Sequence, residues 1–136
     1  DLIKKFLECY NGQEDIKKHI NSKNINKLTD IILSYKDYYN TPRPYHFTYI
    51  IPINPIIISS SRSPSYPSGH AASYRYLYRL FSLFDPDNEA KYYSIYTKGY
   101  YSRMAGGIHF PMDIKEGIRI ADKFFNIIYN EKNCYF

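Results

Sequence analysis

The stretch YPSGHAASY, residues 66–74, places a proline, a serine, a glycine and a histidine directly before a helical apolar pattern. This arrangement predicts a helix over residues 68–84 that the Ser68 hydroxyl can cap. Gly69 has no side chain to obstruct the unpaired backbone N–H groups of the first turn, which lie at the positive end of the helix dipole. The stretch therefore predicts a helix whose N-terminus is open to an anion.

The rest of the chain shows helical periodicity and almost no strand pattern. Helices are predicted over residues 2–12, from 25 to beyond 36, and over 68–84, 87–104 and 111–130. Asn24 and Asp87 are the candidate N-caps of the second and fourth of these helices, and Pro111 suits the first turn of the last. The proline-rich segment 45–66 is expected to be a long irregular connection. We therefore predict an all-α fold, a compact helical bundle of about five to six helices.

The length of 136 residues predicts a single domain over residues 1–136 with a core of its own. Cys9 and Cys134 show no C-x-x-C spacing, which argues against a zinc or redox motif and leaves two free thiols or one bridge open. No apolar run approaches the roughly 20 residues of a membrane span, so a soluble chain is expected. The chain begins at Asp1, and a removed signal peptide would place it in the periplasm or outside the cell. The sequence leaves its compartment and oligomeric state open.

The formal net charge of +5 favours anionic partners. Tyrosines interleave with lysines in residues 91–103, a pattern that a single-strand nucleic-acid platform would use for stacking. The alternative is an amphipathic helix whose tyrosine rings cover the core. We favour the helix, because aromatic spacing alone carries little specificity, and we expect no specific nucleic-acid partner.

Side chains suited to chemistry fall into three clusters, each at the end of an expected helix. They are Lys36 and Arg43; Ser68, Gly69 and His70; and Arg103, His109 and Asp113. Each member has an ordinary structural explanation when taken alone, such as a solvated surface charge or an ion pair. Together they suit a phosphoryl group, because Arg forks and a Lys ammonium neutralise its oxygens and a glycine-opened helix N-terminus adds N–H donors.

His109 and Asp113 lie four residues apart, so the carboxylate can accept from one ring nitrogen and leave a lone pair on the other. This makes His109 an oriented nucleophile. His70 has the ordinary pKa range of a general acid and base near neutral pH, and can protonate a leaving oxygen. The two histidines are therefore expected to have different roles.

The patterns K-x6-R-P, P-S-G-H and S-R-x5-H-x3-D occur in this order between residues 36 and 113. They resemble the three-part signature of the type 2 phosphatidic acid phosphatase superfamily, which also holds class A bacterial acid phosphatases and vanadium-dependent haloperoxidases. The resemblance implies a helical bundle with its active site at helix ends, and a metal-independent phosphatase that works through a phosphohistidine.

Carried over by position, the resemblance makes His109 the nucleophile, Asp113 its orienting partner and His70 the acid and base. The phosphate-binding residues would be Lys36, Arg43, Ser68, Gly69 and Arg103. No cofactor is implied, and vanadate is expected to inhibit as a phosphate mimic. The substrate would be a phosphorylated small molecule or a lipid-derived phosphate, and the flanks carry no motif that names it. A vanadium-dependent haloperoxidase is the enzymatic alternative, and a basic, Tyr-rich nucleic-acid-binding module is a more distant one.

Overall fold

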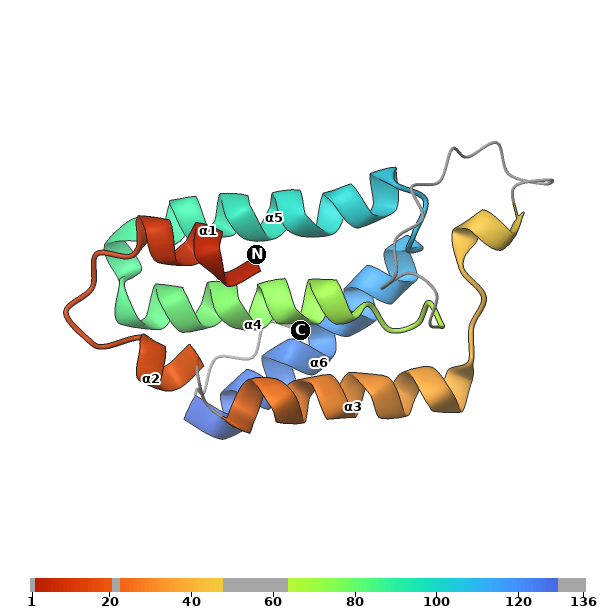
Figure 1. Ribbon diagram of the computed structural model, residues 1–136, viewed down its shortest axis with the longest axis horizontal. Helices are drawn as coiled ribbons and strands as arrows, with labels where there is room; N and C mark the ends of the chain where they lie inside the picture. Colours follow the sequence, from red (N-terminus) through yellow and green to blue (C-terminus); the bar gives the residue numbers. More distant parts are fainter. Residues whose placement is uncertain (1, 21–22, 48–63, 130–136) are drawn as a thin grey trace.

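The computed structural model describes residues 2–20, 23–47 and 64–129 (Figure 1). These residues form helices and contain no strand, so the predicted all-α class is confirmed. The elements in chain order are α1 (Leu2–Cys9), α2 (Lys17–Ile20), α3 (Lys23–Tyr39), the 3-10 helix η1 (Pro44–Phe47), α4 (Gly69–Phe84), the 3-10 helix η3 (Pro86–Asn88), α5 (Glu89–Ala105) and α6 (Pro111–Tyr129).

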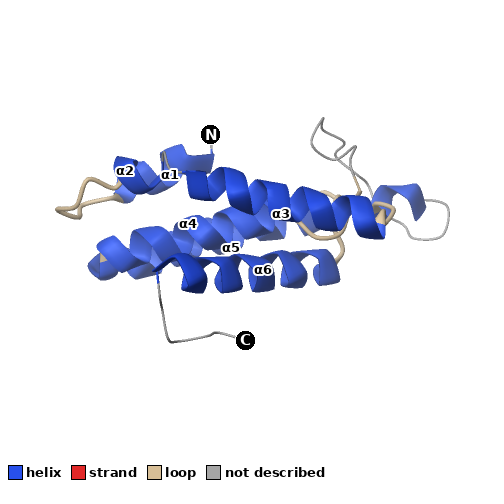
Figure 2. Cartoon of the chain, turned by 90° about the horizontal axis from the view of Figure 1, so that it is seen from below, coloured by secondary structure: helices blue, strands red, loops and turns tan. Residues whose placement is uncertain are grey.

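Helix α4 is the central element of the bundle. It packs most extensively against α5 and α6, and α3 and α1 also contact it. Figures 1 and 2 show these helices gathered around α4. Its buried apolar residues recur at helical spacing on several sides, as expected for a helix with neighbours on most of its surface; they are Ala71, Ala72, Tyr76, Leu77, Leu80 and Phe81.

A polar side chain forms hydrogen bonds at each end of α4. At the N-terminus, the Ser68 hydroxyl accepts a hydrogen bond from the Ala71 N–H at 3.1 Å, as the predicted cap requires. At the C-terminus, the carboxylate of Asp85 accepts from the Tyr92 hydroxyl at 2.5 Å and from the Asn11 N–H at 3.1 Å. The second set of bonds links the end of α4 to α5 and to the segment after α1.

The core is rich in aromatic rings. Phe6 of α1 lies against Phe81 of α4 and Tyr92 of α5, with ring centroids 5.2 and 6.1 Å away. Tyr92 and Tyr96 of α5 are buried, as expected for an amphipathic helix whose tyrosines cover the core.

One buried ion cluster joins α4 to α6. The carboxylate of Asp122, which is fully buried, accepts from Arg75 Nε at 2.7 Å and from Arg79 Nη1 at 3.3 Å. Removing one partner would leave a buried charge uncompensated, so we expect such a substitution to destabilise the contact between the two helices.

Several predicted helix ends differ from the structure. Asn24 lies inside α3, which begins at Lys23, so it is not the N-cap. Asp87 is not a cap either, because Pro86 starts a 3-10 turn and the N-cap of α5 is Asn88. The first helix ends at Cys9, where the Tyr10 N–H bonds to the Leu7 carbonyl in a tighter turn.

The short helices α2 and η1 were not predicted, because runs of four residues give too little periodicity. Most of the connection predicted over 45–66 lies outside the described residues, as does Cys134, so a bridge between Cys9 and Cys134 stays an open alternative. None of the described helices is long and apolar enough to cross a membrane.

Candidate active site

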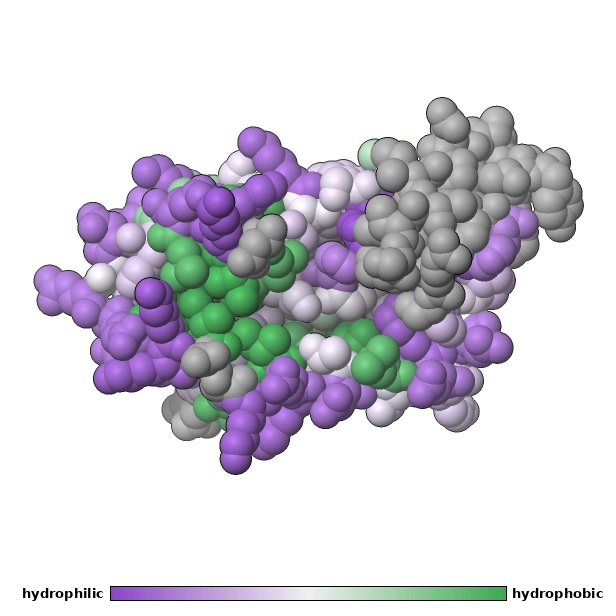
Figure 3. Space-filling view, in the orientation of Figure 1, coloured by the Kyte–Doolittle hydropathy of each residue, from purple (hydrophilic) through white to green (hydrophobic). Residues whose placement is uncertain are grey.

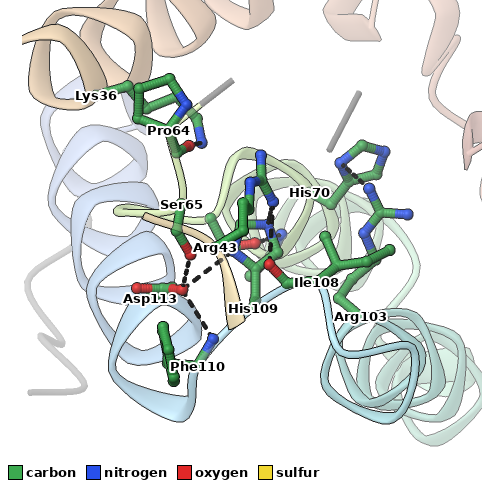
Figure 4. A network of polar contacts seen from close by, with 12 residues as sticks. Lys36, Arg43, Pro64, Ser65, His70, Arg103, Ile108, His109, Phe110 and Asp113 are labelled. Carbon is green, nitrogen blue, oxygen red and sulfur yellow. Dashed lines mark hydrogen bonds and ion pairs between the residues drawn. The ribbon is translucent and has the colours of Figure 1, made fainter. Parts of the chain in front are cut away.

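The predicted site residues meet at one end of the bundle, where several helix ends converge (Figure 4). Lys36 comes from the last turn of α3, and Arg43 from the segment between α3 and η1. Ser68, Gly69 and His70 begin α4, and Arg103 lies in the last turn of α5. His109 and Asp113 bracket the start of α6. The bundle therefore brings together residues that are up to 77 positions apart in the sequence, between Lys36 and Asp113.

His109 is buried, and its two ring nitrogens have different partners. Nδ1 lies 3.3 Å from the Asp113 carboxylate, and Nε2 lies 3.0 Å from Nη1 of Arg43. A guanidinium can only donate, so Nε2 accepts and carries the lone pair, while Nδ1–H donates to the carboxylate. The contacts thus select the tautomer whose lone pair faces away from Asp113.

The buried carboxylate of Asp113 is held as an anion by its donors. Besides His109, its Oδ2 accepts from the Phe110 N–H at 2.8 Å and from the Ser65 hydroxyl. Burial by itself would raise the pKa of Asp113, but the hydrogen bonds from His109, Ser65 and Phe110 lower it below its usual value. Asp113 therefore acts as a fixed acceptor for the imidazole.

Arg43 is almost fully buried, with only 2% of its surface exposed. Its Nη1 also lies 3.2 Å from the Ile108 carbonyl, and its backbone N–H donates to Nδ1 of His46 at 2.9 Å. These contacts hold the guanidinium beside His109 Nε2. A planar fork in this position can take two phosphate oxygens.

A second arginine faces the second histidine. Nη2 of Arg103 lies 3.0 Å from Nδ1 of His70, so Nδ1 accepts and this imidazole is neutral. Lys36 is buried, and its Nζ donates to the Pro64 carbonyl at 2.7 Å. The Ser102 hydroxyl, which precedes Arg103 in the signature, donates to the Gly99 carbonyl of its own helix instead of reaching the site.

The site carries an excess of positive charge, which together with burial lowers the pKa values of its basic groups. Burial, followed by the charges of Arg103, His109, Arg43 and Lys36, lowers the pKa of His70 to about 4. Burial and then Arg43 lower the pKa of Lys36 to about 8. The pKa of His109 is lowered by burial, although Asp113 opposes the shift. A bound anion would reverse the direction of these Coulombic effects.

Two structural residues of the site were missed by the sequence analysis. Ser65, which donates to Asp113, lies in a serine-rich run where no single hydroxyl stands out. Gly117 of α6 lies against the start of α4, where an added Cβ would come within 2.4 Å of the Ser68 carbonyl oxygen. An isolated glycine in a helical pattern was the one signal that could have found it.

The donor set suits an anion better than a metal ion. Within the described part of the chain, no group of three or more His, Cys, Asp or Glu side chains could hold a metal. The site offers two guanidiniums, one ammonium, two imidazoles and a single carboxylate that is already bonded to three donors.

The family model described as the PAP2 superfamily matches residues 24–130. Because this match covers more than half of the chain, the chain belongs to the PAP2 superfamily, the phosphatase-like family that its sequence motifs resemble. A comparison with curated proteins found no significant match.

Proposed function

We propose that this PAP2 superfamily protein hydrolyses phosphate esters without a metal ion, through a phosphohistidine formed on His109. Family membership supports a phosphatase-like hydrolase. The observation that carries the finer proposal is the orientation of His109, whose Nδ1 faces Asp113 and whose Nε2 accepts from Arg43. This orientation gives a nucleophilic lone pair beside a group that binds phosphate oxygens.

In the first step, His109 Nε2 attacks phosphorus as the bond from phosphorus to the ester oxygen breaks. Arg43 exchanges its contact with Nε2 for the phosphate oxygens, so the same movement frees the nucleophile and neutralises the substrate. Binding of the anionic substrate raises the pKa of His70, and Arg103 turns from His70 Nδ1 to the phosphate oxygens, so that His70 binds a proton before the reaction. The departing alkoxide takes this proton from the His70 imidazolium, and the alcohol leaves. Asp113 stabilises the positive charge that develops on the His109 ring.

In the second step, His70 is neutral and takes a proton from water as the water oxygen attacks phosphorus. The bond from phosphorus to His109 Nε2 breaks, inorganic phosphate forms, and both histidines return to their starting states. His70 therefore supplies one proton and recovers one proton in each cycle.

Three cationic side chains would neutralise the negative charge of the phosphoryl group. Arg43 lies on the side of His109 and Arg103 on the side of His70. Lys36 adds a third charge, and the N–H groups of Gly69 and His70, which precede the Ala71 N–H that Ser68 caps, add the dipole of the α4 N-terminus. These fixed groups supply the positive charge that a metal ion provides in other phosphatases.

The test is a panel of phosphate esters with released phosphate as the readout. We expect hydrolysis by the unmodified protein and its loss in His109→Ala. His19→Ala is the matched control, since His19 lies on α2, far from the site, and its loss should leave hydrolysis intact. Halide oxidation by the vanadate-loaded protein without hydrolysis of any ester would favour the haloperoxidase alternative and contradict this proposal.

A further inference from the structure

Ser65 lies in the candidate active site, although it is outside the three motifs of the sequence. Its hydroxyl donates to Oδ2 of Asp113. Ser65 has no exposed surface, so it contributes nothing to the outer face of the molecule drawn in Figure 3. A substrate therefore cannot contact this hydroxyl directly, and any effect of the hydroxyl on the reaction must pass through the carboxylate that it contacts.

The three donors to Asp113 Oδ2 come from two different parts of the chain. His109 and Phe110 lie four and three residues before Asp113, so they move with it at the start of α6. Ser65 is 48 positions away and precedes α4. The bond from Ser65 is therefore the one that fixes the carboxylate relative to another part of the fold.

The segment that carries Ser65 holds Asp113 at a second point. The Ser68 N–H donates to the Asp113 carbonyl at 2.9 Å, and Ser68 caps α4, whose first turn carries His70. One hydrogen bond to the side chain of Asp113 and one to its backbone thus join the nucleophile and its partner to the segment that leads into His70. The backbone bond alone would leave the carboxylate free to rotate relative to α4.

Ser65 is itself anchored by its backbone. Its N–H donates to the Thr41 carbonyl at 2.8 Å, just after the end of α3. The preceding carbonyl, that of Pro64, accepts from Lys36 Nζ at 2.7 Å. Figure 4 shows Pro64 and Ser65 between Lys36 and Asp113. The hydroxyl therefore projects from a fixed backbone, as a group that positions another residue requires.

We propose, on the basis of the function proposed above, that Ser65 is a positioning residue: its hydroxyl fixes the Asp113 carboxylate relative to α4 and thereby aligns His109 Nε2 for attack on phosphorus. In metal sites, loss of a hydrogen-bond partner that orients a ligating side chain typically costs about 10–100-fold in affinity or activity. We expect an effect of similar size on the chemical step here, because attack requires close alignment of nitrogen and phosphorus.

The experiment compares Ser65→Ala with Ser82→Ala, because each variant removes one buried hydroxyl. Ser82 lies near the end of α4, and its Oγ makes no hydrogen bond to the residues that the structure describes. In single turnovers with p-nitrophenyl phosphate, the rate of p-nitrophenol release should fall about 10–100-fold in Ser65→Ala and stay unchanged in Ser82→Ala. The affinity for inorganic phosphate, measured by calorimetry, should stay the same in both variants, because the Ser65 hydroxyl does not contact the anion.

A double substitution tests whether Ser65 acts through Asp113. In Asp113→Ala the carboxylate is gone, so adding Ser65→Ala should slow p-nitrophenol release little further. Reductions that multiply would overturn the inference. It would also be wrong if Ser65→Ala were as fast as the unmodified protein, if Ser82→Ala were slowed equally, or if Ser65→Ala lost phosphate affinity instead of rate; in each case the phosphatase function stands.

NMR of the histidine ring protons separates this inference from the proposed function, since it requires no hydrolysis. The Nδ1–H proton of His109 should exchange slowly with water in the unmodified protein and in Ser82→Ala. It should exchange faster in Ser65→Ala, because the carboxylate that accepts it is no longer fixed. If no ester is hydrolysed, the phosphatase function fails; faster exchange confined to Ser65→Ala would then still support the positioning role, and equal exchange in all three proteins would overturn it.

Discussion

Gly117 is the residue whose replacement most directly tests how the fold positions the site. It lies on the buried face of α6, where an added Cβ would stand 2.4 Å from the Ser68 carbonyl oxygen and 3.3 Å from the Ala72 nitrogen. The Ser68 carbonyl accepts the first hydrogen bond of α4 from Ala72 at 3.1 Å. The Ser68 N–H donates to the Asp113 carbonyl at 2.9 Å, so the start of α4 rests on α6 here.

Two opposing effects decide the stability of Gly117→Ala. Alanine in a helix interior is favoured over glycine by about 0.8–1.0 kcal/mol. Carbon–oxygen contacts normally begin at about 3.3 Å, so the new methyl group would require the two helices to separate by roughly 1 Å. Overpacking of this kind costs typically about 1–3 kcal/mol, and a backbone carbonyl cannot rotate away. After the gain from helix propensity is subtracted, we expect a net loss of up to about 2 kcal/mol in the free energy of unfolding.

The same displacement should impair catalysis. It moves Ser68, Gly69 and His70 relative to His109, and a misplacement of about 1 Å can cost on the order of 10²-fold in rate. Urea unfolding gives the stability, and phosphate release at a temperature where the variant is folded gives kcat/KM.

The matched control for this prediction is Gly99→Ala in α5. Its Cβ would meet the far end of the Tyr74 ring at 2.5 Å, a side chain that can move, so we expect a small effect or a gain from helix propensity. If Gly117→Ala were as stable and as active as Gly99→Ala, the close approach of α4 and α6 would not position the site, and our reasoning would be refuted.

Three further predictions concern the chemistry of the site. Arg43→Lys and Arg103→Lys keep the charge but lose the guanidinium fork, so each should lower kcat/KM about 10²-fold or more, whereas Arg119→Lys on α6 should have little effect; equal losses at all three positions would point to general surface charge. Because the pKa of His70 is lowered to about 4 in the free protein, kcat/KM for alkyl phosphates should fall as pH rises above this value. Bound phosphate raises the pKa of His70, so kcat should begin to fall at a higher pH than kcat/KM does; a fall of both quantities at the same pH would contradict this. Chelators should leave hydrolysis intact and vanadate should inhibit it, while an activity abolished by chelator and restored by Mg²⁺ or Zn²⁺ would exclude the proposed chemistry.

The sequence predicted the long helices well because their signals are local. Ser68 caps α4 as its hydroxyl and position suggest, and the helix ends at Phe84, where the apolar pattern stops. The predicted start at Asp87 failed because Pro86 favours an earlier turn, a choice decided by the junction with α4.

The sequence also predicted which side chains would gather, because the spacing of the three motifs is specific. It could not predict how they contact one another. The bond from Ser65 to Asp113 and the contact of Gly117 with Ser68 join residues 48 and 49 positions apart. Such contacts depend on how α4 and α6 pack, and local periodicity carries no information about this. The low pKa of His70 likewise arises from burial and neighbouring charges that only the assembled bundle brings together.

The central claim is that His109 carries the phosphoryl group, and trapping the intermediate tests it most directly. The protein is mixed with p-nitrophenyl phosphate, quenched, and the phosphorylated residue is mapped by mass spectrometry under conditions that preserve phosphohistidine. In His70→Ala, the good leaving group should still allow phosphorylation while hydrolysis is slow, so an acid-labile phosphate should accumulate on His109 and be absent from His109→Ala. Phosphate found on His70 or on Ser68, or on no residue in any variant, would contradict the account.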